Sequence, residues 1–387
     1  MPARHRAPEP SRSPLLIVFI LIILAGLICG GILLWQKLSP AGPDAASSPP
    51  ASSGAGNSQP PQQAQQTPAP APTPTPEPTP APTPTPAPIP DNGEDGYLSE
   101  GLYIWNNMAF ELFYGYDESA EPYAQAISDF AAQLPGIQVY NMVVPNHCEF
   151  GLPQRLKDQQ GCTSQRENTQ YIYDNLTGAV PVDIYDALNQ HKEEYLYFNT
   201  DTHWAALGAY YAYEKFCETA DVKAAPLEDF TLASYDGFLG YLYQLTAEDC
   251  LAMNPDRLDV YEPGYPYTAA LSYDSGETFS EQEGINSSDS SMGYSMFLRG
   301  DNPCLRVVNK TKLIGRKLAV VKESYGNVIG PFLAASFDET YIIDFRSFEG
   351  SLPEFCQAHG VTDVLFLNST IAANTYARVE DLYTLFP

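Results

Sequence analysis

Three polar side chains that lie far apart in the sequence have the types needed for acyl transfer. Asp201 and His203 lie two positions apart in Thr200-Asp-Thr-His-Trp204, and Ser324 comes much later, in Val321-Lys-Glu-Ser-Tyr-Gly-Asn327. A serine hydroxyl needs an imidazole to take its proton, and a carboxylate fixes the imidazole's tautomer and stabilises its cation. This pattern predicts Ser324 as nucleophile, His203 as base and Asp201 as the orienting carboxylate. Helix capping is an alternative role for Asp201.

A parallel sheet is expected to position these groups. Residues 317–322 read as a short apolar strand that ends just before Ser324. Strands alternate with helices through short connections, which implies right-handed crossovers and a parallel sheet covered on both faces. The predicted strands are residues 137–144, 317–322, 340–345 and 361–367, and the predicted helices are residues 123–134, 204–217, 328–337 and 351–359.

Further polar residues follow these strands. Ligands bind beyond the carboxyl ends of parallel strands, so Asn146, Ser324, Arg346 and Asn368 are expected at one edge. Amides at the start of the helix after Ser324 would face a developing oxyanion. Asn146, Arg346 and Tyr325 are therefore candidates for oxyanion or substrate binding. The alternative for Asn146 and Arg346 is an ordinary surface loop.

The N-terminal part of the chain predicts a membrane anchor. Residues 15–35 form an almost continuous apolar run, which is long enough to cross a bilayer as a helix. Arg4, Arg6 and Arg12 precede the run and only Lys37 follows closely, so residues 1–14 are expected in the cytoplasm and the rest outside. The alternative is a cleaved signal peptide, whose apolar core would be shorter.

Two regions follow the predicted anchor. Residues 39–94 are rich in Pro, Ala, Thr, Ser and Gln, a composition that predicts a disordered, extended linker on the outer side of the membrane. Residues 95–387 are long enough for one extracellular domain with an ordinary core. Within that domain, residues 235–296 are rich in Gly, Ser, Tyr and Asp and predict an irregular or β insertion.

Charge and cysteine content limit the partners. The chain has 47 acidic and 20 basic residues, a net charge of −27, so binding to nucleic acid is not expected. Every cysteine except Cys29 falls in the outer domain, where disulfides can persist. Cys148 and Cys162 would close a short loop, and free thiols are the alternative. His147 has no second ligand pair at a suitable spacing, so neither a metal nor a cofactor is expected.

With these residues placed, the chain resembles the DHHW family of anchored extracellular proteins of Gram-positive bacteria. That family is similar to the AlgJ and AlgX alginate O-acetyltransferases of the SGNH-hydrolase superfamily. The segments that carry the resemblance are Asn199-Thr-Asp-Thr-His-Trp204, Leu207-Gly-Ala-Tyr-Tyr-Ala-Tyr213, Phe238-Leu-Gly240, Tyr294-Ser-Met-Phe297, Val321-Lys-Glu-Ser-Tyr-Gly-Asn327, Pro331-Phe-Leu333, Ile343-Asp-Phe-Arg346 and Thr362-Asp-Val-Leu-Phe366.

The resemblance implies an SGNH-hydrolase-like three-layer α/β/α fold with a mostly parallel sheet, an insertion and a circularly permuted order. It also implies that Asp201, His203 and Ser324 occupy the family's triad positions. Two residues depart from the family pattern. Thr202 stands where the family name has a second histidine, and Glu323 stands where an aspartate is usual.

The expected function is acetyl transfer to a cell-surface polysaccharide through an acyl-serine intermediate. The resemblance implies a membrane-bound O-acyltransferase as the partner that supplies the acetyl group. With water as acceptor, the same three residues would make a deacetylase. A non-catalytic glycan-binding or scaffold protein of the cell envelope is the remaining alternative.

Overall fold

The computed structural model describes residues 89–386. The strands are β1 (Tyr97–Ser99), β2 (Leu102–Trp105), β3 (Met108–Phe110), β4 (Gln138–Val144), β5 (Val180–Pro181), β6 (Phe230–Phe238), β7 (Asp256–Pro263), β8 (Tyr267–Ser272), β9 (Ser280–Gln282), β10 (Cys304–Asn309), β11 (Lys317–Lys322), β12 (Glu339–Asp344) and β13 (Asp363–Ser369). The α-helices are α2 (Asp117–Gln133), α3 (His147–Gly151), α4 (Gln154–Gln160), α5 (Gln165–Asp174), α6 (Tyr185–Gln190), α7 (Ala206–Thr219), α8 (Tyr241–Thr246), α9 (Asp249–Ala252), α10 (Gly330–Leu333), α11 (Leu352–His359), α12 (Thr370–Ala373) and α13 (Tyr376–Tyr383). The 3₁₀ segments are η1 (Leu227–Asp229), η2 (Ser290–Arg299) and η3 (Ser324–Gly326).

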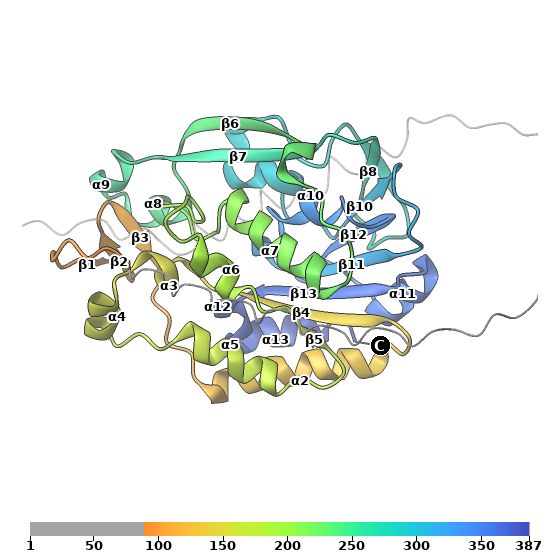
Figure 1. The fold of residues 1–387 in the computed structure, drawn as a ribbon, viewed down its shortest axis with the longest axis horizontal. Coiled ribbons are helices and arrows are strands. Elements are labelled where there is room, and N and C mark those ends of the chain that lie inside the picture. The colour runs from red at the N-terminus through yellow and green to blue at the C-terminus, as the bar shows by residue number, and fades with distance from the viewer. Residues whose placement is uncertain (1–88, 387) are drawn as a thin grey trace, which may run out of the picture. The chain divides into compact units, whose positions relative to one another are not determined.

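An eight-stranded mixed sheet forms the centre of the described part, with the order β5-β4-β13-β11-β12-β10-β8-β9 (Figure 1). The strands from β5 to β12 in this order pair in parallel, and β10, β8 and β9 extend the sheet in antiparallel orientation. The predicted parallel sheet is therefore present. Of its antiparallel strands, β8 and β9 fall within residues 235–296, which were predicted as an irregular or β insertion, and β10 was not predicted.

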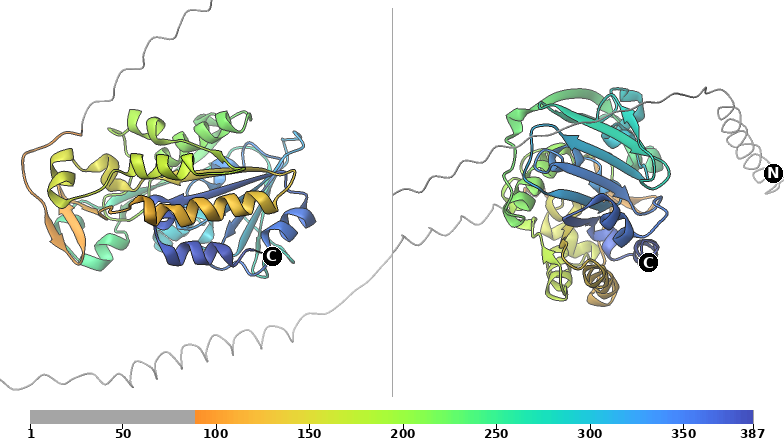
Figure 2. Two further views of the ribbon diagram at one scale, coloured as in Figure 1. Left: turned by 90° about the horizontal axis from the view of Figure 1, so that it is seen from below. Right: turned by 90° about the vertical axis from the view of Figure 1, so that its right-hand side faces the viewer.

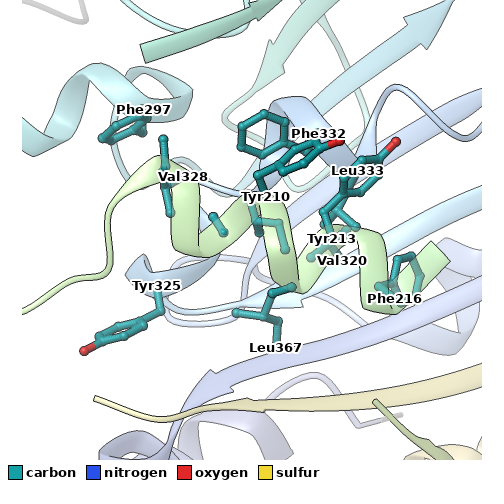
Figure 3. Packing of buried hydrophobic residues seen from close by; sticks show 14 of the residues in the cluster. Tyr210, Tyr213, Phe216, Phe297, Val320, Tyr325, Val328, Phe332, Leu333 and Leu367 are labelled. Carbon is teal, nitrogen blue, oxygen red and sulfur yellow. The ribbon is translucent and has the colours of Figure 1, made fainter. Parts of the chain in front are cut away.

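One face of the sheet packs against α7. Residues at alternate positions of a strand point to the same face, and Leu318 and Val320 of β11 join a core with Leu365 and Leu367 of β13 on this side. Tyr210, Tyr213 and Phe216 recur on one side of α7 and lie over these strands together with Phe332 (Figure 3). This face buries the helix that follows His203.

The opposite face is covered by other helices. Ala319 and Val321 of β11, with Val364 and Phe366 of β13, point to this side. They pack against α2, α11 and α13, and α2 runs along this face in Figure 2 (left). The described domain therefore has helices on both faces of its sheet, as the alternating elements predicted.

The helix predicted over residues 328–337 was wrong in extent. After Ser324 the chain makes the short turn η3, and only the single turn α10 follows. Glycine and proline are poor helix formers, and Gly330 and Pro331 open α10. A Cβ at Gly330 would lie 2.7 Å from Leu298 Cδ2, so this glycine permits close packing. By contrast, α11 matches its prediction, capped by Ser351 and ended by Gly360 in the left-handed region.

The N-terminal predictions lie mostly beyond this structure. Residues 1–14, the predicted anchor 15–35 and the linker up to residue 88 are outside the described residues. Between residues 89 and 386, no helix combines the length and apolarity needed to cross a bilayer. At the end of the predicted linker, Asp91 forms an ion pair with Arg155 of α4 at 2.7 Å.

The cysteines of the described domain are all free, so the suggested bridge between Cys148 and Cys162 is absent. Cys148 is buried and its thiol lies 3.2 Å from Gln165 Nε2. Burial raises the pKa of the Cys148 thiol, so this residue packs as a small apolar side chain.

Candidate active site

Ser324 stands at the carboxyl end of β11, in the tight turn η3. Glu323 fixes this turn, because its carboxylate accepts the amide N–H groups of Tyr325 at 3.1 Å and Ser369 at 2.9 Å. From the other side, the hydroxyl of Tyr294 donates to the carbonyl oxygen of Ser324 at 2.8 Å. The nucleophile candidate is thus held by the ends of two parallel strands and by a residue of η2.

His203 lies within hydrogen-bonding reach of both proposed partners. Its Nε2 is 2.9 Å from the Oγ of Ser324, and its Nδ1 is 2.6 Å from Oδ1 of Asp201. The ring stacks on Tyr294 with centroids 3.7 Å apart and planes at 5°. With its proton on Nδ1, the imidazole donates to Asp201 and can accept the serine proton through Nε2. This is the arrangement that general-base activation of a serine requires.

Asp201 is buried and fully hydrogen-bonded. Beyond its contact with the imidazole, it accepts the amide N–H of His203 at 3.1 Å and that of Tyr241 at 2.8 Å. Burial opposes ionisation of Asp201, but the hydrogen bonds and charge of His203 outweigh it and hold the pKa of this carboxyl below its ordinary value. Gly240 packs directly on it, since a Cβ there would lie 2.2 Å from Asp201 Cβ. The carboxylate is therefore fixed in its charged form.

Ser324 and His203 open into one cavity of about 310 Å³, and Asp201 is buried behind the imidazole. The wall of the cavity combines these two residues with acidic, basic and small side chains. The lining residues are Glu111, Thr202, His203, Glu323, Ser324, Tyr325, Arg346, Ser369, Ile371, Ala372, Thr375 and Arg378. The cavity lies at the carboxyl ends of the parallel strands, on the side of α3 and α12 in Figure 1. A substrate carbonyl could therefore reach Ser324 from solvent.

One predicted binding residue, Asn146, and one residue predicted at the same edge, Asn368, make their hydrogen bonds outside the cavity. Asn146 is buried outside the cavity wall, and its Nδ2 donates to the carbonyl oxygen of Glu111 at 3.1 Å. Asn368 lies inside β13 rather than after it, and its Nδ2 donates to the hydroxyl of Tyr123 at 3.0 Å. Neither Asn146, a candidate for oxyanion or substrate binding, nor Asn368 lines the cavity.

Tyr325 lines the cavity, but it has no free donor for an oxyanion. Its amide donates to Glu323, and its hydroxyl donates to the carbonyl oxygen of Thr202. The amide of Ser324 has no acceptor within residues 89–386. It therefore replaces Tyr325 as the candidate backbone donor.

Arg346 lies in the cavity wall as predicted for a substrate-binding residue, and two aspartates, of which only Asp344 is buried, fix its position. Its Nε donates to Asp344 at 2.8 Å, and its Nη2 lies 2.9 Å from Asp301. Beneath it, Lys322 and Asp344 form an ion pair of 2.7 Å in which each side chain is 1% exposed. This network places a positive charge beside the catalytic candidates.

Several residues of the site were missed from the sequence. Glu111 directly follows the short strand β3, Tyr294 comes from the irregular segment η2, and Arg378 comes from α13. None of them follows a strand of the parallel sheet, which was the signal used to select Arg346. Tyr294 had a weak signal, since it opens one of the segments that carry the family resemblance.

The fold and the site define a class of protein. It is an α/β protein that holds a hydrogen-bonded Asp, His and Ser at the carboxyl edge of a mostly parallel sheet. The profile of the DHHW family, described as "DHHW protein", matches residues 91–343, and the chain belongs to this family. No curated protein matches.

One solved structure supports the family assignment, and others resemble the chain more distantly. A DHHW family protein from Eubacterium siraeum is 32% identical with a TM-score of 0.68, and the match covers 76% of this chain and 98% of that one. PatB1 of Bacillus cereus is 21% identical and shows the same fold at a TM-score of 0.59, over 72% of this chain and 98% of that one. A second PatB1 structure carries a sulfonyl adduct. The O-acetyltransferase domain of Pseudomonas putida AlgJ is 14% identical, with a TM-score of 0.41 over 74% of this chain and 98% of that domain.

Proposed function

We propose that this protein is an extracytoplasmic serine-dependent O-acetyltransferase that modifies a cell-surface polysaccharide. The observation that carries the proposal is the continuous hydrogen-bonded chain from Asp201 through His203 to Ser324, which opens into a cavity at the edge of the sheet. The sequence resemblance to polysaccharide O-acetyltransferases favours transfer over hydrolysis. The fold then corresponds to a permuted SGNH-like arrangement, in which Asp and His precede Ser.

The reaction has two half-reactions. The Oγ of Ser324 attacks the carbonyl carbon of an acetyl donor while His203 Nε2 takes the serine proton. The bond to the leaving group breaks, and His203 returns the proton to that group. In the second half-reaction an acceptor hydroxyl gives its proton to His203 and attacks the acyl carbon. The ester bond to Ser324 then breaks, and its oxygen regains the proton.

Donors near Ser324 would stabilise the negative charge of the tetrahedral intermediates. The free amide of Ser324 supplies one backbone donor, and Arg346 supplies a fixed positive charge in the same cavity. Donors already in position act at no cost of reorganisation during the reaction. Asp201 stays ionised and stabilises the imidazolium that forms in both half-reactions.

Location and partners are also part of the proposal. Residues 15–35 would anchor the protein in the cell membrane, with residues 39 to about 90 as a spacer to the outer domain. The acetyl group would come from a membrane-bound O-acyltransferase. The acidic chain, with a net charge of −27, favours a neutral rather than a polyanionic acceptor.

The test measures whether an acetyl group is transferred to Ser324. Full-length protein in detergent is mixed with 4-nitrophenyl acetate, and the burst of 4-nitrophenol is followed beside Ser324→Ala and His203→Ala. We expect a burst and an acetyl mass on intact protein, both lost in the two variants. A sulfonyl fluoride should label the wild type and leave Ser324→Ala unlabelled. Ser234→Ala, an exposed serine of β6, is the matched control.

The alternatives give different results. Acetate release without acetyl transfer to an added neutral oligosaccharide would identify a deacetylase. Equal rates in the wild type and both variants would overturn the enzymatic proposal and favour a glycan-binding or scaffold protein.

A further inference from the structure

A third carboxylate, Glu111, lies in the wall of the cavity that contains Ser324. It directly follows β3, and its carbonyl oxygen accepts a hydrogen bond from Asn146 Nδ2 at 3.1 Å. Its Oε2 accepts a hydrogen bond from the hydroxyl of Thr202. Next to it, the amide of Ala109 donates to the carbonyl oxygen of Asn199 at 2.9 Å, which ties β3 to the loop that carries His203. Both the backbone and the side chain of Glu111 are therefore held in place.

Glu111 differs from the other carboxylates of the site in its unused oxygen. Both oxygens of Asp201 and both of Glu323 accept hydrogen bonds from protein groups. Within residues 89–386, Oε1 of Glu111 has no such partner. Burial raises the pKa of Glu111, and the nearby charges of Asp201 and Glu323 add to the effect. Glu111 is only partly exposed and lines the cavity, so its unpaired Oε1 can accept a hydrogen bond from a ligand hydroxyl there.

We infer that Glu111 binds a second hydroxyl group of the acceptor, beside the hydroxyl that becomes acetylated. The site then selects molecules with neighbouring hydroxyl groups, such as sugars, over monohydric alcohols and water. This inference rests on the proposed function and names its acceptor class. It also gives Asn146 a role, since the residue expected to contact substrate instead fixes the backbone of Glu111.

Glu111 takes no part in bond making. The attacking hydroxyl gives its proton to His203 Nε2, its oxygen forms the new ester, and Ser324 Oγ leaves and regains the proton. Meanwhile the neighbouring hydroxyl donates a hydrogen bond to Glu111 and keeps its proton. The contact with Glu111 orients the acceptor, because it limits the bound molecule to positions in which its attacking hydroxyl points at the acyl carbon.

The experiment is a competition between two acceptors of similar size. Full-length protein is acetylated with 4-nitrophenyl acetate in equal concentrations of glycerol and 1-propanol, and the two acetate esters are measured. We expect the wild type to favour glycerol about tenfold or more, the effect of one hydrogen bond to a charged group. Glu111→Met should abolish this preference, and Glu111→Gln, which keeps an acceptor oxygen, should retain part of it.

Two further variants separate binding from a purely structural role. Glu193→Met changes an exposed glutamate outside the cavity and should keep the wild-type preference. Thr202→Val removes the hydroxyl that orients Glu111 and should weaken the preference partially. If wild type forms no acyl-enzyme, the proposed function fails together with this inference. If wild type forms it and Glu111→Met keeps the glycerol preference, or wild type shows no preference, this inference alone is overturned.

Discussion

The two sides of the candidate site differ in how they are built. On one side, the ends of the parallel strands place Ser324 after β11 and Arg346 after β12. On the other side, Glu111, Asp201 and Tyr294 come from a short strand end, a loop and an irregular 3₁₀ segment. The regular side supplies the nucleophile, and the irregular side holds and orients the base. The comparison indicates that the sheet sets the position of the nucleophile, while the irregular segments hold and orient the base that activates it.

The largest expected effect tests whether the irregular side is catalytic at all. Asp201→Asn keeps the shape of the side chain but removes the charge that stabilises the imidazolium and fixes its tautomer. We expect the turnover of 4-nitrophenyl acetate to fall by about 10⁴-fold. Asp158→Asn, an exposed residue of α4, is the control. A loss below tenfold would mean that Asp201 only supports the local backbone.

This asymmetry also explains what the sequence could predict. Strands β4, β11 and β12 and helix α11 were found within a residue or two, because buried parallel strands are short apolar runs and α11 has a serine cap and a glycine end. The pair formed by Asp201 and His203 was found because the two residues lie two positions apart in the sequence and are chemically complementary.

The remaining site residues had no local signal. Glu111 reaches the cavity only because Thr202 and Asn146 hold it, and both contacts join segments distant in sequence. The antiparallel strand β10 was missed, and β8 was predicted only as part of an irregular or β insertion, since their pairing depends on tertiary contacts rather than on a repeated local pattern. Asn146 lies outside the cavity wall, because following a strand places a residue at an edge but does not set where its side chain points.

A second prediction concerns the ion pairs that join the two sides. Lys322 of β11 contacts Asp344 of β12, and it also lies 3.4 Å from Asp301, which follows η2. Lys322→Met would leave buried Asp344 with only Arg346 as its cationic partner. We expect a loss of about 3–5 kcal/mol in the free energy of unfolding, measured in urea.

The same strand offers a matched control for this prediction. Lys317 begins β11 and pairs with Glu339 at 2.7 Å, but it is partly exposed. Lys317→Met should cost only about 0–1 kcal/mol, as exposed ion pairs do. Similar losses in the free energy of unfolding for Lys322→Met and Lys317→Met would show that the buried ion pairs do not join the regular side of the site to the irregular side.

A third prediction tests Tyr294 as a positioning residue for His203. Tyr294→Phe keeps the stacked ring but removes the hydrogen bond to the carbonyl oxygen of Ser324. We expect a two- to tenfold lower kcat with little change in KM, from the loss of about 0.5–1.5 kcal/mol. Tyr294→Leu, which also loses the stacking, should lower kcat further. Equal kcat for the Leu variant and the wild type would overturn this role.

The smallest expected effect is a gain in stability on the irregular side. Burial raises the pKa of Glu111 above its ordinary value of 4.5. The folded state then binds this proton more tightly than the unfolded state, so the contribution to stability is complete below about pH 4.5 and is lost as pH rises through the folded pKa. Glu111→Gln should therefore unfold at a slightly higher temperature than wild type at pH 7.

The pH dependence separates this effect from simple repacking. Near pH 4 the two proteins should unfold at almost the same temperature, because wild-type Glu111 is then protonated and resembles the amide. A gain that is equal at pH 4 and pH 7 would mean that the carboxylate charge is not the cause. A gain confined to neutral pH would show that the fold keeps a carboxylate here at the expense of stability, as expected for a group that serves a ligand.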